Sequence, residues 1–219
     1  MDASYIGVLM PTLLQGTLQT LALFALTLVL ALPLGLPFAL GSNSKFLPLR
    51  WLSRTYVWIF RGTPLMLQLF FFYYGLGIMG IDLGQFPAAV LTFVLNYAAY
   101  FAEIYRAGIQ SIDRGQHEAA KTLGFTPWKT MRYIIIPQAV ARIIPPVCNE
   151  TITLVKDTAL VNVIGVAELL KAAKSAVNRD VNPTAYLLAA AIYLLLTFAL
   201  TMLSQKLEKR FNRFERKDA

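Results

Sequence analysis

Long intervals without charge are the most prominent feature of this chain. No charged residue lies between Asp2 and Lys45, and none lies between Arg61 and Asp82. Each interval contains the roughly 20 predominantly apolar residues that an α-helix needs to cross the hydrocarbon core of a bilayer. The first interval has no lysine or arginine before it and is too long for the apolar region of a signal peptide, so we expect it to remain as a membrane helix.

Three further apolar stretches follow, at about 86–107, 134–158 and 184–205. With one helix at about 17–41 and another directly after the sequence RGTP, they bring the expected number of membrane helices to about five. Charged residues and prolines interrupt the fourth stretch. No internal repeat and no linker divides the chain. The pattern therefore predicts an all-α, polytopic membrane protein whose whole length, 1–219, forms a single transmembrane domain.

The composition agrees with a membrane protein and changes how the net charge is interpreted. Hydrophobic residues make up 57% of the chain and charged residues 15%, which lies outside the usual range of soluble domains. A formal net charge of +8 alone would suit a nucleic-acid-binding protein. The basic residues, however, gather in alternate loops, as the positive-inside rule describes.

Placing the N-terminus outside and the C-terminus inside puts most of these basic residues in the cytoplasm. Only Lys171, Lys174 and Arg179 then lie on the external side. The positive charge is therefore a topology signal, and we expect no nucleic-acid partner. The basic residues on the cytoplasmic side are Lys45, Arg50, Arg54, Arg106, Arg114, Lys121, Lys129, Arg132, Lys206, Lys209, Arg210, Arg213, Arg216 and Lys217.

A short amphipathic helix is expected on the external side, within about 163–180. Its apolar residues recur at helical spacing, opposite two lysines. These apolar residues are Val166, Leu169, Leu170, Ala173 and Val177.

The cytoplasmic loop at about 109–137 predicts two short helices. Residues 118–123 suit the first helix, and Gly124 is placed to end it in a left-handed conformation. Thr126 would then cap a second helix that begins at Pro127. The loop is thus expected to be a compact folded element.

The second of these helices is expected to run to about Ile136, before Pro137 stops it. Trp128, Met131 and Ile135 fall on one of its faces, which would present an apolar knob to the cytoplasm. Two interpretations remain open on physical grounds. The pair of helices could lie on the lipid surface, or it could be a docking element for a soluble partner.

The same loop resembles the EAA loop of bacterial ABC importer permeases. The resemblance rests on EAA at 118–120, on Gly124 and on IIIP ending at Pro137, with Ile136 where leucine is usual. Other segments are similar to permeases of the polar amino acid uptake subfamily, which serves histidine, arginine, glutamine and cystine. Tyr97 departs from the subfamily, where a small residue is common. The similar segments are RGTP at 61–64, NYAAYFAEIYRAGIQSI at 96–112, KDTAL at 156–160 and VIGVAEL at 163–169.

The resemblance implies an ABC type I importer permease fold in the cell inner membrane, and a chain that is not an enzyme. The loop would be the coupling helix that sits in a groove of a cytoplasmic ATPase. The chain lacks the G-x-x-x-x-G-K-[ST] phosphate loop, so a separate ATPase dimer would bind ATP and Mg, and this chain would bind no cofactor or metal. The coupling residues would be Glu118, Ala119, Ala120, Gly124, Phe125, Trp128 and Pro137.

Two further partners follow from the resemblance. One is a second permease chain, identical or homologous, that faces this one across the translocation path. The other is an extracytoplasmic amino acid-binding protein that delivers a polar amino acid to the outer loops.

Polar residues within the spans are the candidates for substrate binding, because ionisable groups are costly inside a membrane. Glu150, Thr153 and Asp157 recur at helical spacing, which puts two carboxylates and a hydroxyl on one face. A surplus of carboxylates would favour a cationic amino acid. The remaining candidates are Asn96, Tyr100, Gln68 and Glu103.

Each of these residues also has a structural interpretation. Arg142 could satisfy Glu150, a basic residue of another helix could satisfy Asp157, and Arg106 could pair with Glu103. Polar residues in a bundle often hydrogen-bond across helices without touching a substrate.

Two other functions remain as alternatives. The first is a self-sufficient secondary amino acid transporter or channel with Glu150 and Asp157 as ion sites, although no inverted repeat supports it. The second is a membrane scaffold that does not transport and whose loop recruits a partner.

Overall fold

The computed structural model describes residues 3–211, and every regular element in that part of the chain is helical. Arg213, Arg216 and Lys217 of the predicted cytoplasmic tail lie outside the described residues. Short π-helical turns at Phe71–Gly75 and Met131–Ile135 and a 3-10 helix at Thr158–Ile164 join longer helices. The α-helices are α1 (Ala3–Ser42), α2 (Leu47–Gly62), α3 (Leu65–Phe70), α4 (Leu76–Ile78), α5 (Gln85–Gln110), α6 (Arg114–Thr122), α7 (Pro127–Thr130), α8 (Ile136–Asp157), α9 (Leu169–Asp180) and α10 (Thr184–Phe211).

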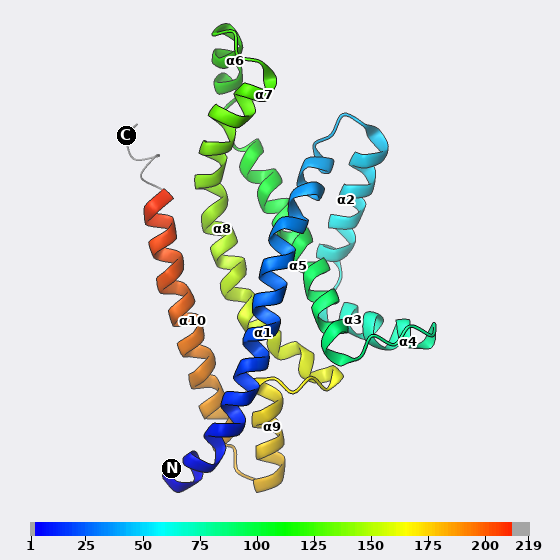
Figure 1. Cartoon of the computed structure of the whole chain (residues 1–219), viewed down its shortest axis with the longest axis vertical. Coiled ribbons are helices and arrows are strands. Elements are labelled where there is room, and N and C mark those ends of the chain that lie inside the picture. Colours follow the sequence, from blue (N-terminus) through cyan, green and yellow to red (C-terminus); the bar gives the residue numbers. More distant parts are fainter. Residues whose placement is uncertain (1–2, 212–219) are drawn as a thin grey trace.

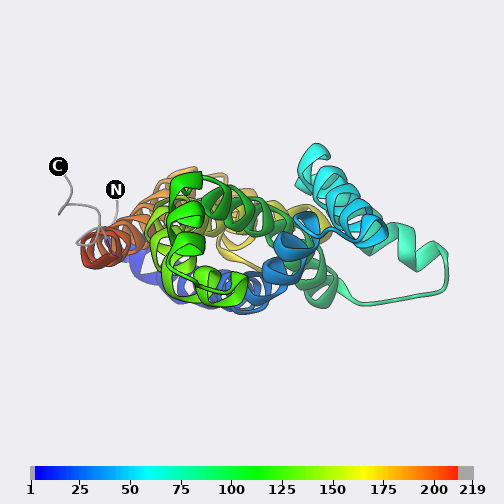
Figure 2. The ribbon, with the colours of Figure 1, turned by 90° about the horizontal axis from the view of Figure 1, so that it is seen from above.

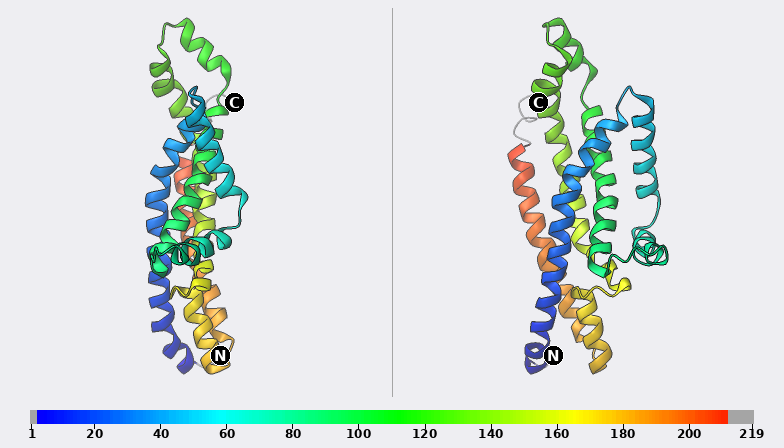
Figure 3. Two further views of the ribbon diagram at one scale, coloured as in Figure 1. Left: turned by 90° about the vertical axis from the view of Figure 1, so that its right-hand side faces the viewer. Right: turned by 45° about the vertical axis from the view of Figure 1, so that its right-hand side comes forward.

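The long helices run along one common axis (Figure 1). α1, α5, α8 and α10 form the elongated body, α6 and α7 lie at one end of it, and α9 lies at the other. α2 runs beside α1 and α5, and α3 and α4 then turn away from the body. Seen from above, α2, α3 and α4 project from one side of the molecule (Figure 2). The same projection is visible in the right-hand view of Figure 3.

Three helices of the described part, α1, α5 and α10, are long and apolar enough to cross a membrane. α8 occupies the predicted fourth stretch, and its charged residues set it apart from these three. The all-helical fold is therefore confirmed. The number of five spans and the orientation with the N-terminus outside stay predictions.

α2 occupies most of the segment after α1, where a cytoplasmic loop with Lys45, Arg50 and Arg54 was expected. This segment is a regular helix whose buried residues Ser53 and Val57 face the bundle. The helix ends because Pro64 disfavours helical geometry in the preceding residue, and Thr63 is extended at φ −119° and ψ 145°. A helix begins directly after RGTP, as expected, but it is the short α3, and the π-helical turn at Phe71–Gly75 follows it.

Pro137 corrects a second boundary, because the helix continues through it into α8. Proline lacks an N–H and clashes with the carbonyl one turn earlier, so it normally breaks a helix. Here the π-helical turn at Met131–Ile135 widens the backbone directly before the proline. Such a turn accommodates the missing hydrogen bond without ending the helix.

The main core lies where α1 and α5 cross. Phe93 and Phe101 of α5 are fully buried there against Leu23 and Ala31 of α1. The two backbones approach so closely that a Cβ atom on Gly35 would lie 3.0 Å from Cβ of Phe101 and 3.1 Å from the carbonyl oxygen of Ala98. Small residues at such crossings permit close helix packing in membranes.

The expected amphipathic helix is confirmed as α9, although it begins at Leu169 because Thr158–Ile164 is a 3-10 helix. Leu169 and Ala173 pack against α1 and α10. The fully buried Glu168 caps α9 by accepting hydrogen bonds from the backbone N–H groups of Leu170 (2.7 Å) and Lys171 (2.6 Å). Its carboxylate also accepts a hydrogen bond from the hydroxyl of Tyr193 on α10 (2.9 Å).

Candidate functional site

A cavity of about 440 Å³ opens where α2 breaks into α3, between the break, α5 and α8. Five of the seven predicted substrate residues line it together, so the structure gathers in one place side chains that lie far apart in the sequence. We call it the central cavity. Its lining consists of Arg61, Gly62, Thr63, Pro64, Leu65, Asn96, Tyr97, Tyr100, Glu150, Thr153 and Asp157.

α8 contributes one wall of the central cavity. Glu150, Thr153 and Asp157 follow one another at helical spacing, and all three line the cavity, as the sequence pattern predicted. The hydroxyl of Thr153 also donates to the carbonyl of Asn149, one turn back along the helix, over 3.1 Å. The wall therefore presents two carboxylates with a hydroxyl between them.

The carboxylate of Asp157 is held by a neighbouring helix. The hydroxyl of Tyr97 on α5 donates to its Oδ2 atom over 2.8 Å. The expected partner of Asp157 was a basic residue, and the observed partner is a neutral hydroxyl. Asp157 thus keeps its second oxygen for other donors in the cavity.

The carboxylate of Glu150, in contrast to that of Asp157, accepts no hydrogen bond from a neighbouring helix of the described residues. Among residues 3–211, no side chain or backbone group donates a hydrogen bond to its carboxylate. Arg142, the neighbour expected to satisfy it, instead donates to the carbonyl of Ser111. The half-buried carboxylate of Glu150 is consequently available to a cationic group in the cavity.

Gln68 and Asn96 satisfy the backbone at the break between α2 and α3. The amide of Gln68 donates to the carbonyls of Phe60 (2.9 Å) and Thr63 (3.1 Å). Asn96 donates to the same Phe60 carbonyl (3.0 Å) and to Oε1 of Gln68 (3.0 Å). Gln68 does not line the central cavity and lies instead in a neighbouring, mostly apolar pocket. These contacts fix the shape of the cavity, because carbonyls freed by a broken helix need donors away from water.

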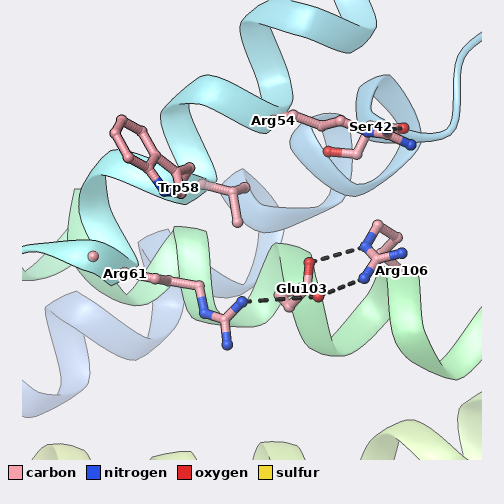
Figure 4. A pocket seen from close by; sticks show the side chains of 8 residues that line it. Ser42, Arg54, Trp58, Arg61, Glu103 and Arg106 are labelled. Carbon is pink, nitrogen blue, oxygen red and sulfur yellow. Dashed lines mark hydrogen bonds and ion pairs between the residues drawn. The ribbon is translucent and has the colours of Figure 1, made fainter.

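Glu103 lies outside the central cavity, in a neighbouring pocket of about 600 Å³ between α2 and α5 (Figure 4). Its oxygens accept hydrogen bonds from Nε (2.9 Å) and Nη2 (2.5 Å) of Arg106. The expected ion pair between Glu103 and Arg106 is therefore confirmed. We call this space the Glu103 pocket; Arg54 and Arg61 also line it.

Arg61 and Tyr97 also line the central cavity with ionisable side chains, and neither was among the sequence candidates. In the sequence Arg61 marks only the start of a charge-free interval and the first residue of RGTP, and in the structure it lies at the C-terminal end of α2. Tyr97 was noted only as a departure from a related pattern. The signal that would have found Arg61 is its position beside the Thr63–Pro64 break, where chain direction changes and polar groups converge.

The cytoplasmic loop forms the two short helices that the sequence predicted, although the first begins at Arg114 rather than at 118. Asp113 caps α6, and Gly124 follows it with φ +77°, a left-handed conformation. Thr126 caps α7 by accepting a hydrogen bond from the N–H of Lys129 over 3.4 Å. Pro127 is the first residue of α7. The two short helices form a compact knob at one end of the molecule (Figure 1).

The exposed face of this knob differs from the expected one. Trp128 is 68% exposed, but Ile135 is fully buried and packs with Met131 against Ile112. The apolar surface instead includes Leu123, which is 74% exposed. The other predicted coupling residues are exposed apart from the buried Ala120; they are Glu118, Ala119, Gly124, Phe125 and Pro137.

No group of three or more histidine, cysteine, aspartate or glutamate side chains with the arrangement of a metal site occurs within residues 3–211.

Comparison with known proteins adds a family relationship. The profile of the family described as binding-protein-dependent transport system inner membrane component matches residues 31–213. The chain is 41% identical to the L-cystine transport system permease protein TcyB of Bacillus subtilis over 206 residues, which cover 93% of this chain and 88% of TcyB. It is 40% identical to the arginine transport system permease protein ArtQ of the same organism, with 91% and 92% covered.

Solved structures agree with this relationship. A crystal structure of an amino acid ABC transporter with histidines superposes with a TM-score of 0.91 at 37% identity, covering 96% of this chain and 99% of that one. An inward-facing form of the MetNI methionine ABC transporter superposes with a TM-score of 0.72 at 19% identity and the same coverage, which supports the fold alone.

Proposed function

We propose that this chain, which belongs to the family of binding-protein-dependent transport system inner membrane components, is the permease subunit of an ATP-dependent importer of polar amino acids. The observation that supports this function most strongly is the central cavity, whose lining brings Glu150 and Asp157 together with Arg61. A zwitterionic amino acid needs groups of both signs. Relatives named for cystine, arginine and glutamine transport support the substrate class.

In this proposal Glu150 and Asp157 attract the cationic groups of the substrate. Glu150 has no hydrogen-bond donor within the described residues, so a bound ammonium or guanidinium would supply one. Thr153 adds a hydroxyl on the same wall. Two carboxylates on one wall favour an amino acid with a cationic side chain over an acidic one, because an acidic side chain would be repelled.

Energy for transport enters through the knob formed by α6 and α7. Leu123 and Trp128 project from it, and a folded surface of exposed apolar side chains suits a groove on a protein partner. We propose that a separate ATPase dimer, which binds ATP and Mg, receives the knob. α7 continues through the π-helical turn into α8, so a displacement of the knob would act directly on the helix that carries Glu150 and Asp157.

Two further partners complete the proposed importer. A second permease chain, identical or homologous, would cover the side where α2, α3 and α4 project. Exposed aromatic side chains on that side, among them Trp58 and Phe71, support a protein contact there. An extracytoplasmic amino acid-binding protein would deliver the substrate at the end that holds α9.

Reconstitution tests the proposed function. Proteoliposomes would contain this chain with its ATPase or this chain alone, and uptake of labelled L-arginine, L-glutamine and L-cystine would be measured with ATP or with an ion gradient. The proposal predicts uptake only when the ATPase, ATP and the binding protein are all present. Robust gradient-driven uptake by the chain alone would establish a secondary transporter instead.

A further inference from the structure

We propose that Arg61 binds the α-carboxylate of the transported amino acid, in the cavity that the two carboxylates of α8 also line. The inference rests on the proposed function, because it names the group that recognises one end of the substrate. Arg61 stands in the last turn of α2, immediately before the break that opens the central cavity. It lines both the central cavity and the Glu103 pocket, so its side chain stands at the boundary between them.

The guanidinium of Arg61 retains unused donors. Its side chain is 40% exposed, and its Nη1 atom lies 3.8 Å from Oε1 of Glu103, which is beyond hydrogen-bonding distance. Within residues 3–211 the Arg61 side chain donates no hydrogen bond. A guanidinium carries five N–H donors in a planar fork. Arg61 therefore presents a charged group whose donors suit a planar anion.

Glu103 does not depend on Arg61. Both of its oxygens already accept hydrogen bonds from Arg106, as Figure 4 shows, at 2.9 Å and 2.5 Å. The contact with Arg61 is thus the weaker of two cationic contacts. A carboxylate that offered Arg61 two short, parallel hydrogen bonds would replace it at small cost, because such bidentate pairs are the stronger kind.

The aromatic ring of Tyr100 holds Arg61 at the cavity. The guanidinium carbon lies 5.3 Å from the ring centroid, which is within the range of a cation–π contact. Tyr100 also lines the central cavity. The arginine is therefore held by a contact that uses none of its N–H donors in a hydrogen bond, which leaves them for a ligand.

The walls of the central cavity then match the ends of an amino acid. Arg61 offers donors to the carboxylate, and Glu150 and Asp157 offer acceptors to the ammonium or a cationic side chain. An analogue with an amide in place of the α-carboxylate keeps the contacts of its cationic groups with Glu150 and Asp157. It loses the negative charge that Arg61 would bind. Comparing the acid with its amide thus isolates the contribution of Arg61.

Equilibrium dialysis tests the assignment. The permease with its ATPase, in nanodiscs and without the binding protein, would be titrated with labelled L-arginine and L-glutamine, and with their α-amides. We expect the wild type to prefer the acid to the amide at least about tenfold, and Arg61→Gln to lose affinity for the acid by about 10- to 100-fold while affinity for the amide changes little. Arg61→Lys, which keeps the charge but not the fork, should fall between them.

Arg54→Gln is the matched control, because Arg54 lines the Glu103 pocket but not the central cavity, and its Nε donates to the carbonyl of Ser42. It should keep the wild-type preference for the acid. An unchanged ratio of acid to amide affinity in Arg61→Gln, or an equal loss for both ligands, would overturn the assignment. If Arg61→Gln fails to assemble, the ratio of acid to amide affinity in Arg61→Lys decides, and a wild-type ratio there would overturn the assignment. A wild type that binds none of these amino acids would refute the proposed function itself.

Discussion

Tyr97 on α5 and Asp157 on α8 are joined by a hydrogen bond of 2.8 Å from the phenol hydroxyl to Oδ2 of the carboxylate. The bond ties α5 to α8, the helix that continues from the cytoplasmic knob. It leaves the second oxygen of Asp157 for the cavity. Different mutations can therefore test the hydrogen bond that positions this carboxylate and the negative charge that it offers to a substrate.

Asp157→Asn removes the charge of this side chain, and Tyr97→Phe removes the hydrogen bond that positions it. The asparagine oxygen still accepts from Tyr97, so we expect Asp157→Asn to melt like the wild type and to lose about tenfold in affinity for a cationic amino acid. Tyr97→Phe removes the bond and keeps the charge, and should lower the stability of the complex by about 1 kcal/mol. Thermal melting and ligand binding on the same preparations measure both effects. A large loss of stability in Asp157→Asn would contradict this division.

The network at the break between α2 and α3 predicts a stability effect. Gln68→Ala removes donors to the carbonyls of Phe60 and Thr63 and an acceptor for Asn96. We expect a loss of roughly 2 kcal/mol, because each interhelical hydrogen bond contributes about 1 kcal/mol or less in a membrane. Gln15→Ala, at an exposed position of α1, should change the stability little. Denaturant titration of the purified complex measures both variants, and equal effects would contradict the assigned role.

The left-handed turn at Gly124 can be tested for its part in coupling ATP hydrolysis to transport. Its φ of +77° is strained for residues with a side chain, although open space surrounds the position where a Cβ would lie. Gly124→Asn should couple nearly as the wild type, because asparagine tolerates this conformation, and Gly124→Val should lose most coupling. Gly124→Pro should abolish it, since proline fixes φ near −65° and removes the N–H that donates to Lys121.

The measurement is ATPase activity stimulated by the amino acid and its binding protein, alongside membrane insertion, which all three variants should retain. Glu118→Lys, which reverses a charge on the exposed surface of α6, should also abolish coupling. A fully coupled Gly124→Pro variant would show that the left-handed turn has no part in docking.

Glu168 predicts a pH dependence. Burial raises the pKa of its carboxyl, and hydrogen bonds from Leu170, Lys171 and Tyr193 oppose that effect only in part. The folded state then binds the proton more tightly than the unfolded state. Folding stability must therefore fall as the pH rises from the unfolded pKa of about 4.3 through the folded value.

Glu168→Gln removes this titration. The stability of the wild type relative to Glu168→Gln should decrease as the pH rises across that window. Melting temperatures at several pH values between about 4.5 and 8 measure the difference, starting near the unfolded carboxyl pKa. A relative stability that increases with pH would mean that the hydrogen bonds dominate and the pKa is lowered.

The sequence predicted the cytoplasmic knob closely because its signals are local. Gly124, Thr126 and Pro127 each favour one backbone conformation, and neighbouring residues alone decide it. Pro137 was misread for the same reason. Its local effect is to stop a helix, but the π-helical turn before it, held by packing of Ile135 in the core, lets the helix continue.

The composition of the central cavity was predictable only in part. Glu150, Thr153 and Asp157 share one face of one helix, so spacing was enough to group them. Arg61 and Tyr97 join them through tertiary packing between α2, α5 and α8, which leaves no periodic signal. α2 was missed because its arginines interrupt the charge-free pattern that marks a membrane helix.

The central claim is that the carboxylates of Glu150 and Asp157 in the central cavity bind the substrate during transport. The most direct measurement is ATP-dependent uptake of labelled amino acid by proteoliposomes that contain the complete importer with Glu150→Ala and Asp157→Ala combined. Co-purification of the ATPase serves as the control for assembly. We predict intact assembly and uptake reduced at least about tenfold, as expected when charge-assisted contacts to the substrate are lost. Uptake equal to that of the wild type would contradict the account and support a scaffold whose cavity does not carry the amino acid.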